Sequence, residues 1–348
     1  MANASRHRVR FPSPESAEVI TEDAPRPDAR EVRVRTRFSA ISPGTERLIY
    51  QGNVPDNLEA DTSIDALQGE ELSYPISYGY ACVGEVDKLG AEVDETWRGT
   101  RVFAFQPHVS RFVSSVEALV PLPDSADLTD AVMLPSLETA VNLVMDGRPV
   151  IGEMVLVLGQ GVVGLLTTRL LADFPLGTLV TVDPLPSRRA RSEDMGATEA
   201  LDTLSASDLE NASEFPMSPS VDREGANADL TYELAGQPSA LNDAIRHTGF
   251  DGRIVVGSWY GTKRAPIDLG GRFHRSRIQI VSSQVSTVAP KYQGRWSKSR
   301  RMSVVVGLLD RVQPSQLITD QFPIEQAPHV YEKLASESPM LQPIFEYE

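Results

Sequence analysis

The chain has 348 residues, five histidines, a single cysteine and a net charge of −15 at pH 7. This length exceeds what one hydrophobic core usually serves and predicts two domains. The acidic excess disfavours a nucleic-acid partner, because phosphates are bound mainly through cations. The lone Cys82 excludes an intramolecular disulfide, and no apolar run reaches the roughly 20 residues that span a bilayer.

The N-terminal stretch MANASRHRVRF lacks the apolar core of a signal peptide, so we expect a cytoplasmic protein without a membrane partner. Acidic residues are abundant and lysines are few. This composition is typical of an acidic proteome in a salty cytoplasm, and equally of an acidic mesophile. It does not distinguish the two.

The first part of the chain predicts a compact β-rich unit. Residues 31–40 alternate apolar and polar side chains, which predicts a half-buried strand, and the stretch ISPGTE (41–46) predicts the turn that ends it. Residues 52–75 are acidic and rich in turn formers, which predicts a solvated loop or a lid. Further short strands are predicted within residues 78–90, 100–107, 110–115 and 118–124.

Helices begin near Leu128, with candidate N-caps at Thr129 and Ser136. From Glu153 onward strands and helices alternate, which predicts a parallel sheet. The strands are predicted at 153–159, 178–183, 228–236, 252–261 and 277–285, and the helices at 161–174, 186–197 and 238–249. Residues 205–228 are polar and predict a loop or a weak helix.

The C-terminal tail departs from this rhythm. It predicts a helix at 297–312, a strand end and helix at 316–336, and a last strand at 341–348 that returns to the first domain. We therefore expect an α/β protein with two domains. Residues 1–150 and 286–348 form the β-rich one, and residues 151–285 form a doubly wound parallel sheet.

The strongest motif is VLVLGQGVVGLL, which carries GxGxxG directly after a predicted strand and at the start of a predicted helix. Gly159 permits a tight turn, Gly161 lets the backbone approach a pyrophosphate, and Gly164 lets the helix pack closely on the strand. The amides of the helix start, around Val162 and Val163, then face the phosphates. The motif predicts a dinucleotide site.

Asp183 ends the next predicted strand, about twenty residues after the glycines, where an acid accepts hydrogen bonds from the adenosine ribose. A 2′-phosphate there would meet like charge, which favours NAD over NADP. Arg188 and Arg189 follow and could partly offset that repulsion. The alternative is an ordinary surface helix start with one arginine over the adenine.

Together these parts resemble the medium-chain dehydrogenase/reductase superfamily, over nearly the whole chain. The shared features are a Gly-Thr-Glu corner, the glycine strand YGYACVGEV, the GQGVVG turn with Asp183, the strand GRIVVGSWYG and the tail QFPIEQAPHVYEKL. The resemblance implies a GroES-like catalytic domain beside a Rossmann domain. The stretch SPGTERLIYQGNVP is also similar to the corner of the bacteriochlorophyllide a dehydrogenase-like branch.

Within this resemblance, the positions of the catalytic zinc ligands have other residues. The corner cysteine is replaced by Pro43, the His-Glu pair of the glycine strand by Tyr80 and Ala81, and the third ligand region supplies Pro135. The cysteines of a structural zinc lobe are also missing. We therefore expect a zinc-independent member with no metal site.

Without a metal, charge on the reacting oxygen must be met by hydrogen-bond donors. Thr45 lies where relatives place a proton-relay hydroxyl, and its alternative role is a turn residue that caps local backbone. Tyr80 could donate to a carbonyl oxygen, or its ring could simply fill the volume of the missing metal. We expect Glu46 to pair with an arginine. His108 and Glu138 could reach the pocket, but we expect them to lie at the surface or in a cap.

The resemblance also assigns residues to the nicotinamide. Thr139 corresponds to a residue that touches its ribose, and three others lie beside its carboxamide: Val256, Ser258 and Ser283. An arginine that relatives place against the pyrophosphate aligns with Gln342, so this contact is expected to be lost. The basic run Lys291–Arg301 could supply charge instead, or be a solvated helix start.

These observations predict an NAD(P)-dependent oxidoreductase that prefers NAD and interconverts a small secondary alcohol and its carbonyl compound. Two alternatives stay open: an NADPH-dependent reductase of C=C bonds in quinones or enones, and a dinucleotide-binding sensor without chemistry. Relatives pair through an edge strand that corresponds to residues 278–285, which predicts a homodimer.

Overall fold

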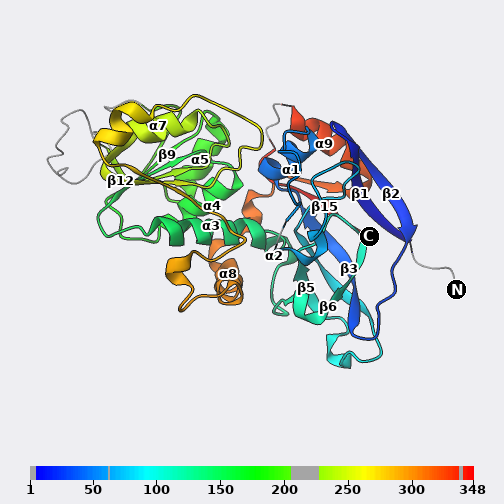
Figure 1. Cartoon of the computed structure of the whole chain (residues 1–348). Coiled ribbons are helices and arrows are strands. Elements are labelled where there is room, and N and C mark those ends of the chain that lie inside the picture. Colours follow the sequence, from blue (N-terminus) through cyan, green and yellow to red (C-terminus); the bar gives the residue numbers. More distant parts are fainter. Residues whose placement is uncertain (1–4, 62, 205–226, 337–339) are drawn as a thin grey trace. The chain divides into compact units, whose positions relative to one another are not determined.

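The computed structural model describes residues 5–61, 63–204, 227–336 and 340–348. The chain forms two compact units (Figure 1): the first comprises Met1–Pro135 and Val306–Glu348, and the second comprises Ser136–Val305. These units are defined by compactness, so the domain boundaries expected from the sequence, 1–150 with 286–348 and 151–285, stay a prediction.

The first unit is built on a seven-stranded sheet with the order β14-β15-β3-β4-β5-β7, in which β6 also pairs with β3. Its strands are β3 (Glu31–Ala40), β4 (Cys82–Leu89), β5 (Arg101–Ala104), β6 (Arg111–Ser115), β7 (Val120–Pro121), β14 (Asp320–Pro323) and β15 (Pro343–Glu346). The strands expected from the sequence are therefore present, and the described part of the acidic stretch 52–75 contains the short 3-10 turn η1 (Asp65–Leu67) and no helix or strand.

Strand β3 shows why this sheet forms. Its alternating residues Val32, Val34 and Thr36 are buried, and the two valines join a core that includes Cys82 and Phe112. Strand β15 pairs with β3 antiparallel, with Ile344 opposite Ala40. The C-terminal tail therefore returns to the β-rich unit, as the sequence predicts.

Two local elements of the first unit differ from the expectations. The stretch ISPGTE does not end in a turn, because α1 (Pro43–Tyr50) begins inside it. Pro43 occupies the helix start, where its missing N–H costs nothing and its fixed φ suits the helix. The N-terminal hairpin of β1 (Ser5–Ser13) and β2 (Ser16–Asp23), which packs on α9 (Ala327–Ala335), was not predicted.

The expected helix caps at Thr129 and Ser136 are wrong. Helix α2 (Leu128–Ala131) is capped by Asp127, whose carboxylate accepts hydrogen bonds from the backbone N–H and the hydroxyl of Thr129. Helix α3 (Leu134–Gly147) already begins at Leu134, so Ser136 lies inside its first turn. Asp127 caps α2 by accepting the Thr129 N–H, which places Thr129 inside the first turn instead of at the cap.

The second unit is a six-stranded parallel sheet with the order β10-β9-β8-β11-β12-β13. Its strands are β8 (Met154–Leu158), β9 (Thr178–Val182), β10 (Glu199–Leu201), β11 (Ala228–Glu233), β12 (Thr248–Val256) and β13 (Gln279–Ser282). Counted along the chain this is the order 3-2-1-4-5-6 of a doubly wound dinucleotide-binding sheet. Its switch point lies between β8 and β11.

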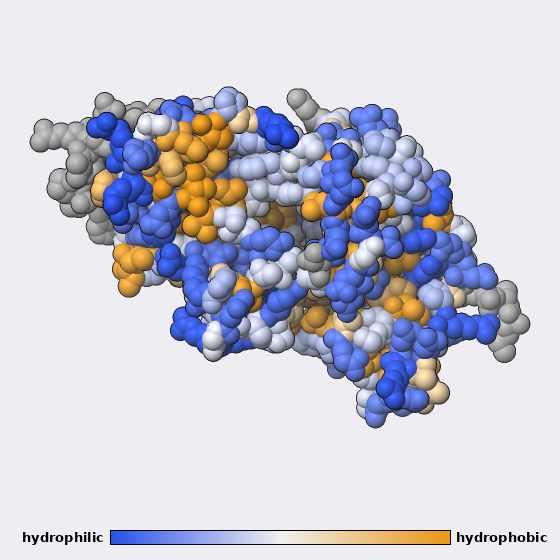
Figure 2. Space-filling model, in the orientation of Figure 1, coloured by the Kyte–Doolittle hydropathy of each residue, from blue (hydrophilic) through white to orange (hydrophobic). Residues whose placement is uncertain are grey.

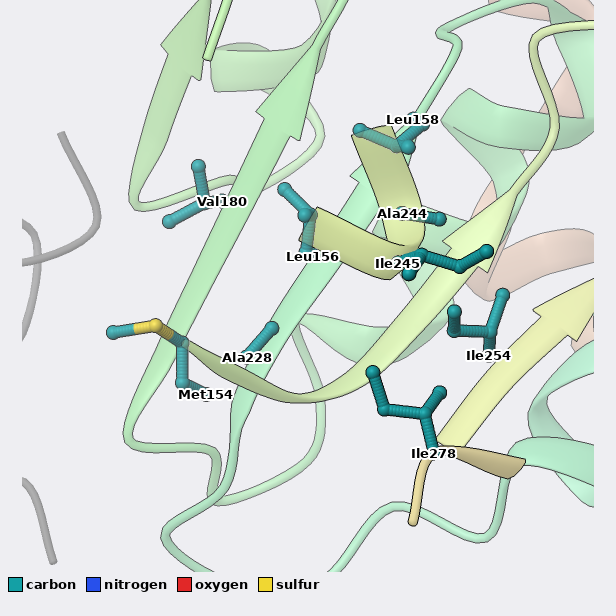
Figure 3. Close-up of a cluster of buried hydrophobic side chains, with 9 residues drawn as sticks. All are labelled: Met154, Leu156, Leu158, Val180, Ala228, Ala244, Ile245, Ile254 and Ile278. Carbon is teal, nitrogen blue, oxygen red and sulfur yellow. The ribbon is translucent and has the colours of Figure 1, made fainter. Parts of the chain in front are cut away.

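The helices of the second unit include α3, α4 (Val162–Leu171), α5 (Pro186–Asp194), α7 (Ala240–His247) and the first half of α8 (Lys298–Val312). Figure 3 shows a core that they form with the sheet. Its members are Met154, Leu156, Leu158, Val180, Ala228, Ala244, Ile245, Ile254 and Ile278. Strands buried on both faces explain the continuous apolar run of MVLVL.

The surface of the second unit also carries hydrophobic residues. Figure 2 shows them gathered where Figure 1 draws α5, α7 and β9. Leu185, just before α5, is 40% exposed.

Among the described residues, no helix is both long and apolar enough to cross a membrane. The loop or weak helix predicted at 205–228 lies almost entirely outside the described residues.

Candidate functional site

The glycine motif forms the turn between β8 and α4. Gly159 has φ of +92°, and a Cβ there would lie 2.6 Å from the Ala235 backbone. A Cβ on Gly164 would lie 2.1 Å from the Gly159 carbonyl oxygen, so only glycine permits this close packing of helix on turn. In contrast, a Cβ on Gly161, the N-cap of α4, would meet nothing within 4 Å.

The space beside Gly161 and the free amides at the start of α4 are what a pyrophosphate requires. Val162 and Val163 open the helix, and Val162 is buried against the sheet. The residues present therefore fit a dinucleotide at this turn.

Asp183 directly follows β9 and is 3% exposed. Its carboxylate accepts hydrogen bonds from the backbone N–H of Gln160, at 2.8 Å, and of Leu185, at 2.9 Å. Asp183 thus ties the glycine turn to the start of α5. The Arg188 guanidinium lies 3.6 Å from the same carboxylate, whereas Arg189 donates to the carbonyl oxygens of Asp183 and Pro184.

A polar group lies at the carboxyl ends of β11 and β12. The fully buried Glu233 accepts hydrogen bonds from the Tyr260 hydroxyl and the Ala235 N–H, and burial raises the pKa of its carboxyl. The Ser258 hydroxyl accepts from the Gly236 N–H at 2.9 Å, so it links the loop after β12 to the turn after β11. Val256 is the last residue of β12 and is half-buried.

Ser283 follows β13 and continues the ladder, since its N–H donates to the Val256 carbonyl at 2.9 Å. Its hydroxyl donates to Asp146 at 2.8 Å and accepts from the Asn142 amide at 3.0 Å. Thr139 lies on the same helix, α3, and is half-buried. The parallel sheet therefore brings the glycine turn, Asp183, Val256, Ser258 and Ser283 to its one carboxyl edge, where doubly wound folds bind their ligands.

The first unit holds the second group of candidate residues. The side chains of Ser42 and Thr45 lie beside Tyr80 and act to lower the pKa of its hydroxyl, so the structure brings the two predicted catalytic residues together and adds Ser42 to them. Burial is the main cause that raises the pKa of Tyr80 to about 12, with the carboxylates of Glu46 and Asp61 acting in the same direction. At neutral pH this phenol is protonated and can donate.

Glu46 does not pair with an arginine, which corrects the expectation. It is fully buried, and its carboxylate accepts hydrogen bonds from the Ser42 N–H at 2.7 Å, from His108 at 2.9 Å and from the Tyr331 hydroxyl. The other ring nitrogen of His108 lies 2.7 Å from the Ser39 hydroxyl. Glu46 therefore fixes the backbone of Ser42, a residue that lies beside Tyr80.

Three further expectations need correction or completion. His108 is fully buried in this network and is not a surface residue. Glu138 is 4% exposed and forms an ion pair with Arg301 at 2.9 Å, so it is not a surface cap either. Gln342 is buried in the first unit, where its amide donates to the Ile41 and Pro343 carbonyls.

Several residues of these groups were missed from sequence, and four examples are Ser42, Gln160, Tyr260 and Arg301. Ser42 stands in the SPGTE stretch and could have been found there. The other three depend on tertiary contacts that leave no local signal.

The donor set around Tyr80 does not fit a zinc ion. Pro43 and Pro135 have no side-chain atom that could bind a metal. The phenol of Tyr80 has a pKa of about 12 and therefore keeps its proton at neutral pH. Glu46 and His108 already use their donor and acceptor atoms on each other, Ser39, Ser42 and Tyr331. Within the described ranges no three histidine, cysteine, aspartate or glutamate side chains are grouped as metal ligands would be.

Comparison with known proteins agrees with this fold. Residues 162–301 match the family model described as zinc-binding dehydrogenase. D-guloside 3-dehydrogenase of Escherichia coli K12 is 23% identical over 290 residues, which cover 78% of this chain and 79% of that protein. Sorbitol dehydrogenase of Bacillus subtilis is 21% identical over 292 residues, which cover 74% of this chain and 77% of that protein.

Solved structures align over nearly the whole chain. An alcohol dehydrogenase from Escherichia coli CFT073, complexed with NADH, superimposes with a TM-score of 0.76 at 18% identity and covers 99% of each chain. A zinc-binding dehydrogenase from Sinorhizobium meliloti, bound to NADP, gives a TM-score of 0.72 at 17% identity, with 99% of this chain and 100% of that chain covered. At these identities the likeness shows the fold.

Proposed function

We propose that the chain is an oxidoreductase of the medium-chain dehydrogenase/reductase superfamily, and that it interconverts a secondary alcohol and its ketone with NAD, without zinc. The alcohol dehydrogenases and polyol dehydrogenases among its relatives support a small hydroxylated substrate. The single observation that carries the zinc-free version is that Tyr80, with Ser42 and Thr45 beside it, stands where the resemblance would place a zinc ligand.

The cofactor half of the proposal rests on the carboxyl edge of the parallel sheet. The amides at Gly161, Val162 and Val163 would hold the pyrophosphate, and Asp183 the adenosine ribose. Asp183 repels a 2′-phosphate, and Arg188, 3.6 Å away, offsets only part of that charge. We therefore propose NAD as the preferred cofactor, with NADP as the weaker one.

The nicotinamide ring, when bound, supplies or accepts the hydride. For its surroundings we propose Thr139 on α3, Val256 and Ser258 after β12, and Ser283 after β13. Three of these four residues lie at the ends of neighbouring strands on the far side of the switch point from Asp183. That separation matches the two ends of a dinucleotide laid across the sheet edge.

On the substrate side, Tyr80 would donate a proton to the reacting oxygen of the substrate. During reduction its O–H proton passes to the substrate oxygen while the carbonyl carbon receives hydride, and the product is the alcohol. The Thr45 or Ser42 hydroxyl then returns a proton to the phenolate from solvent. Because the phenol is protonated at neutral pH, this arrangement favours reduction over oxidation under those conditions.

We also propose a homodimer formed through β13. This strand is the edge of the six-stranded sheet, and Val281 on it is 37% exposed. An edge strand with an exposed apolar residue is a ready pairing surface for its own copy. Light scattering after size-exclusion chromatography should then give twice the chain mass, and Val281→Lys should shift the protein to monomer.

The test of the function uses purified protein that has been checked for metal by elemental analysis. It is incubated with NADH or NADPH and a panel of ketones and ketoses, and with NAD or NADP and the corresponding alcohols. We expect turnover of at least one pair, faster with NADH, that survives dialysis against a chelator. Stoichiometric zinc whose removal abolishes turnover would contradict the zinc-free mechanism.

The same panel includes quinones and enones, because reduction of an activated C=C bond is the remaining alternative. Turnover confined to those compounds, with NADPH preferred, would replace the alcohol version. Loss of turnover in Tyr80→Phe and Thr45→Val, with cofactor binding retained, supports the assigned roles. Full activity in both variants would remove them from the mechanism.

A further inference from the structure

Arg301 is a fully buried arginine that belongs neither to the glycine turn nor to the set of hydroxyl side chains formed by Tyr80, Ser42 and Thr45. It lies on α8 and has 0% exposure, which makes it one of the largest fully buried side chains of the described residues. Its guanidinium donates to the Glu138 carboxylate at 3.0 Å and to the Asn142 side-chain carbonyl, both on α3. In all, the guanidinium donates four hydrogen bonds, and every acceptor is an oxygen atom.

Two of these contacts reach the backbone after β13. The guanidinium donates to the Val285 carbonyl and, at 3.2 Å, to the Thr287 carbonyl. A planar group with five donors is suited to hold two backbone carbonyls and a carboxylate in one fixed arrangement. Arg301 thereby fixes the segment that leaves the carboxyl edge of the sheet.

The start of the same segment is held from α3. Asn142 donates to both the Ser283 hydroxyl and Asp146, and Ser283 donates to Asp146. Asn142 is therefore shared, because its carbonyl binds Arg301 and its amide binds Ser283. Farther along, the Tyr292 hydroxyl donates to the Met145 carbonyl at 2.6 Å. Residues 283–292 are tied to one face of α3.

A buried network of charged groups contributes little net stability, because removing the charges from water costs free energy. Desolvation raises the pKa of Glu138 even though Arg301 lies beside it. Replacing a buried ion pair by apolar residues of similar volume is often neutral or stabilising. A network of this kind is more useful where one backbone conformation must be fixed, which here is the segment that follows Ser283.

We propose that Arg301 is a positioning residue for the nicotinamide half of the dinucleotide, which it serves by fixing the backbone from Ser283 to Thr287. This inference rests on the proposed function, because it takes Ser283 to lie beside the nicotinamide. In the proposed function the adenosine half would be bound by other elements, namely the turn after β8 and Asp183 after β9, which a hydrogen bond joins. The two halves of the cofactor therefore depend on different residues of the same sheet edge.

The experiment compares two ligands that differ in the nicotinamide alone. Calorimetry gives the dissociation constants of NADH and ADP-ribose for the full chain and for Arg301→Met and Arg301→Lys. ADP-ribose affinity should stay within about twofold, while NADH affinity falls about tenfold or more toward that of ADP-ribose. Lysine keeps the charge but cannot hold both carbonyls and Glu138, so it should not restore NADH binding.

Two further variants separate this role from general damage. Arg300→Met is the matched control, because the neighbouring Arg300 is exposed and lies over the Trp296 ring, and it should bind both ligands normally. Ser283→Ala, which removes two hydrogen bonds at the other end of the segment, should reproduce the selective loss if Arg301→Met fails to fold.

Each other outcome has a definite meaning. An equal loss of NADH and ADP-ribose binding in Arg301→Lys and Ser283→Ala would make the network a general support of the fold and overturn the proposal. Unchanged binding of both ligands in these variants would overturn it as well. If the unmodified protein binds neither ligand, the proposed function itself has failed, and the inference about Arg301 falls with it.

Discussion

The Glu46 carboxylate and the His108 ring lie 2.9 Å apart in the interior of the first unit, and neither side chain is exposed. They come from α1 and from the stretch before β6, 62 residues apart in the chain. Every oxygen of Glu46 has a donor, since the Ser42 N–H and the Tyr331 hydroxyl complete the set. The pair therefore joins the start of α1 to two distant parts of the unit.

Removal of one partner should be far more costly than the pair's net contribution to stability. In His108→Leu the buried Glu46 loses a donor, and we expect the free energy of unfolding to fall by about 3–5 kcal/mol. Urea unfolding followed by circular dichroism measures this. Glu46→Gln keeps an acceptor for the Ser42 N–H and should lose less. An equal, small loss in both variants would show that the pair is not needed.

The strands and the dinucleotide turn could be predicted from sequence because their signals are local. Strand β3 has the predicted bounds, since the alternation of EVRVRTRFSA places Val32 and Val34 on one face. The glycines of GQGVVG form a local signal, because Gly159 and Gly164 lie five positions apart and pack closely on each other, although Gly159 also meets the distant backbone of Ala235.

The contacts of Glu46 could not be predicted in this way. Its partner Tyr331 lies 285 residues away, and no periodicity links the two. The same holds for Arg301, whose partner Glu138 is 163 residues earlier in the chain. The helix start at Pro43 is a different failure, because the Pro-Gly pair favours a turn, whereas proline also suits the first helical position and the Glu46 carboxylate accepts the Ser42 N–H.

Tyr80→Phe tests the role of the phenol in catalysis. We expect kcat for ketone reduction to fall by about 10²–10⁴-fold, because the variant loses the proposed general acid. KM for the cofactor should change little, since the cofactor residues lie on the other unit. The neighbouring Tyr78, whose ring packs edge-on against Tyr80, offers the control Tyr78→Phe, which should keep most activity. Equal effects of the two changes would count against a special role for Tyr80.

Stability should fall at alkaline pH. The pKa of Tyr80 is raised by burial from 10.0 to about 12, and burial also raises that of Tyr331. Between pH 10 and 12 the unfolded chain has lost the Tyr80 proton that the folded chain still binds. Each rise in pH then favours unfolding. Urea midpoints at pH 8, 9, 10 and 11 should decline only above pH 10, and a constant midpoint would refute this linkage.

Asp183 should control the choice of cofactor. In Asp183→Ser the carboxylate that repels a 2′-phosphate is gone and Arg188 is freed from it, so we expect the ratio of kcat/KM for NADP to that for NAD to rise about tenfold or more. Steady-state kinetics with both cofactors measures the ratio. Adding Arg188→Ala should abolish the gain. A ratio that stays unchanged in Asp183→Ser would show that another residue sets the preference.

One chemical change, tyrosine to phenylalanine, should have opposite effects at two buried positions. The Tyr232 hydroxyl is buried without a hydrogen-bond partner among the described residues and lies where a Cβ on Gly147 would be only 2.1 Å away. Tyr232→Phe removes an unsatisfied polar group, so we expect the free energy of unfolding to rise by about 1 kcal/mol.

Tyr331 is also fully buried, but its hydroxyl donates to Glu46. Tyr331→Phe leaves the carboxylate short of a donor, and the free energy of unfolding should fall by about 1–3 kcal/mol. Thermal and urea unfolding of the two variants under one set of conditions give the comparison. Because both changes remove the same atom from a buried ring, a loss of equal size in each would mean that packing, and not hydrogen bonding, decides their effect.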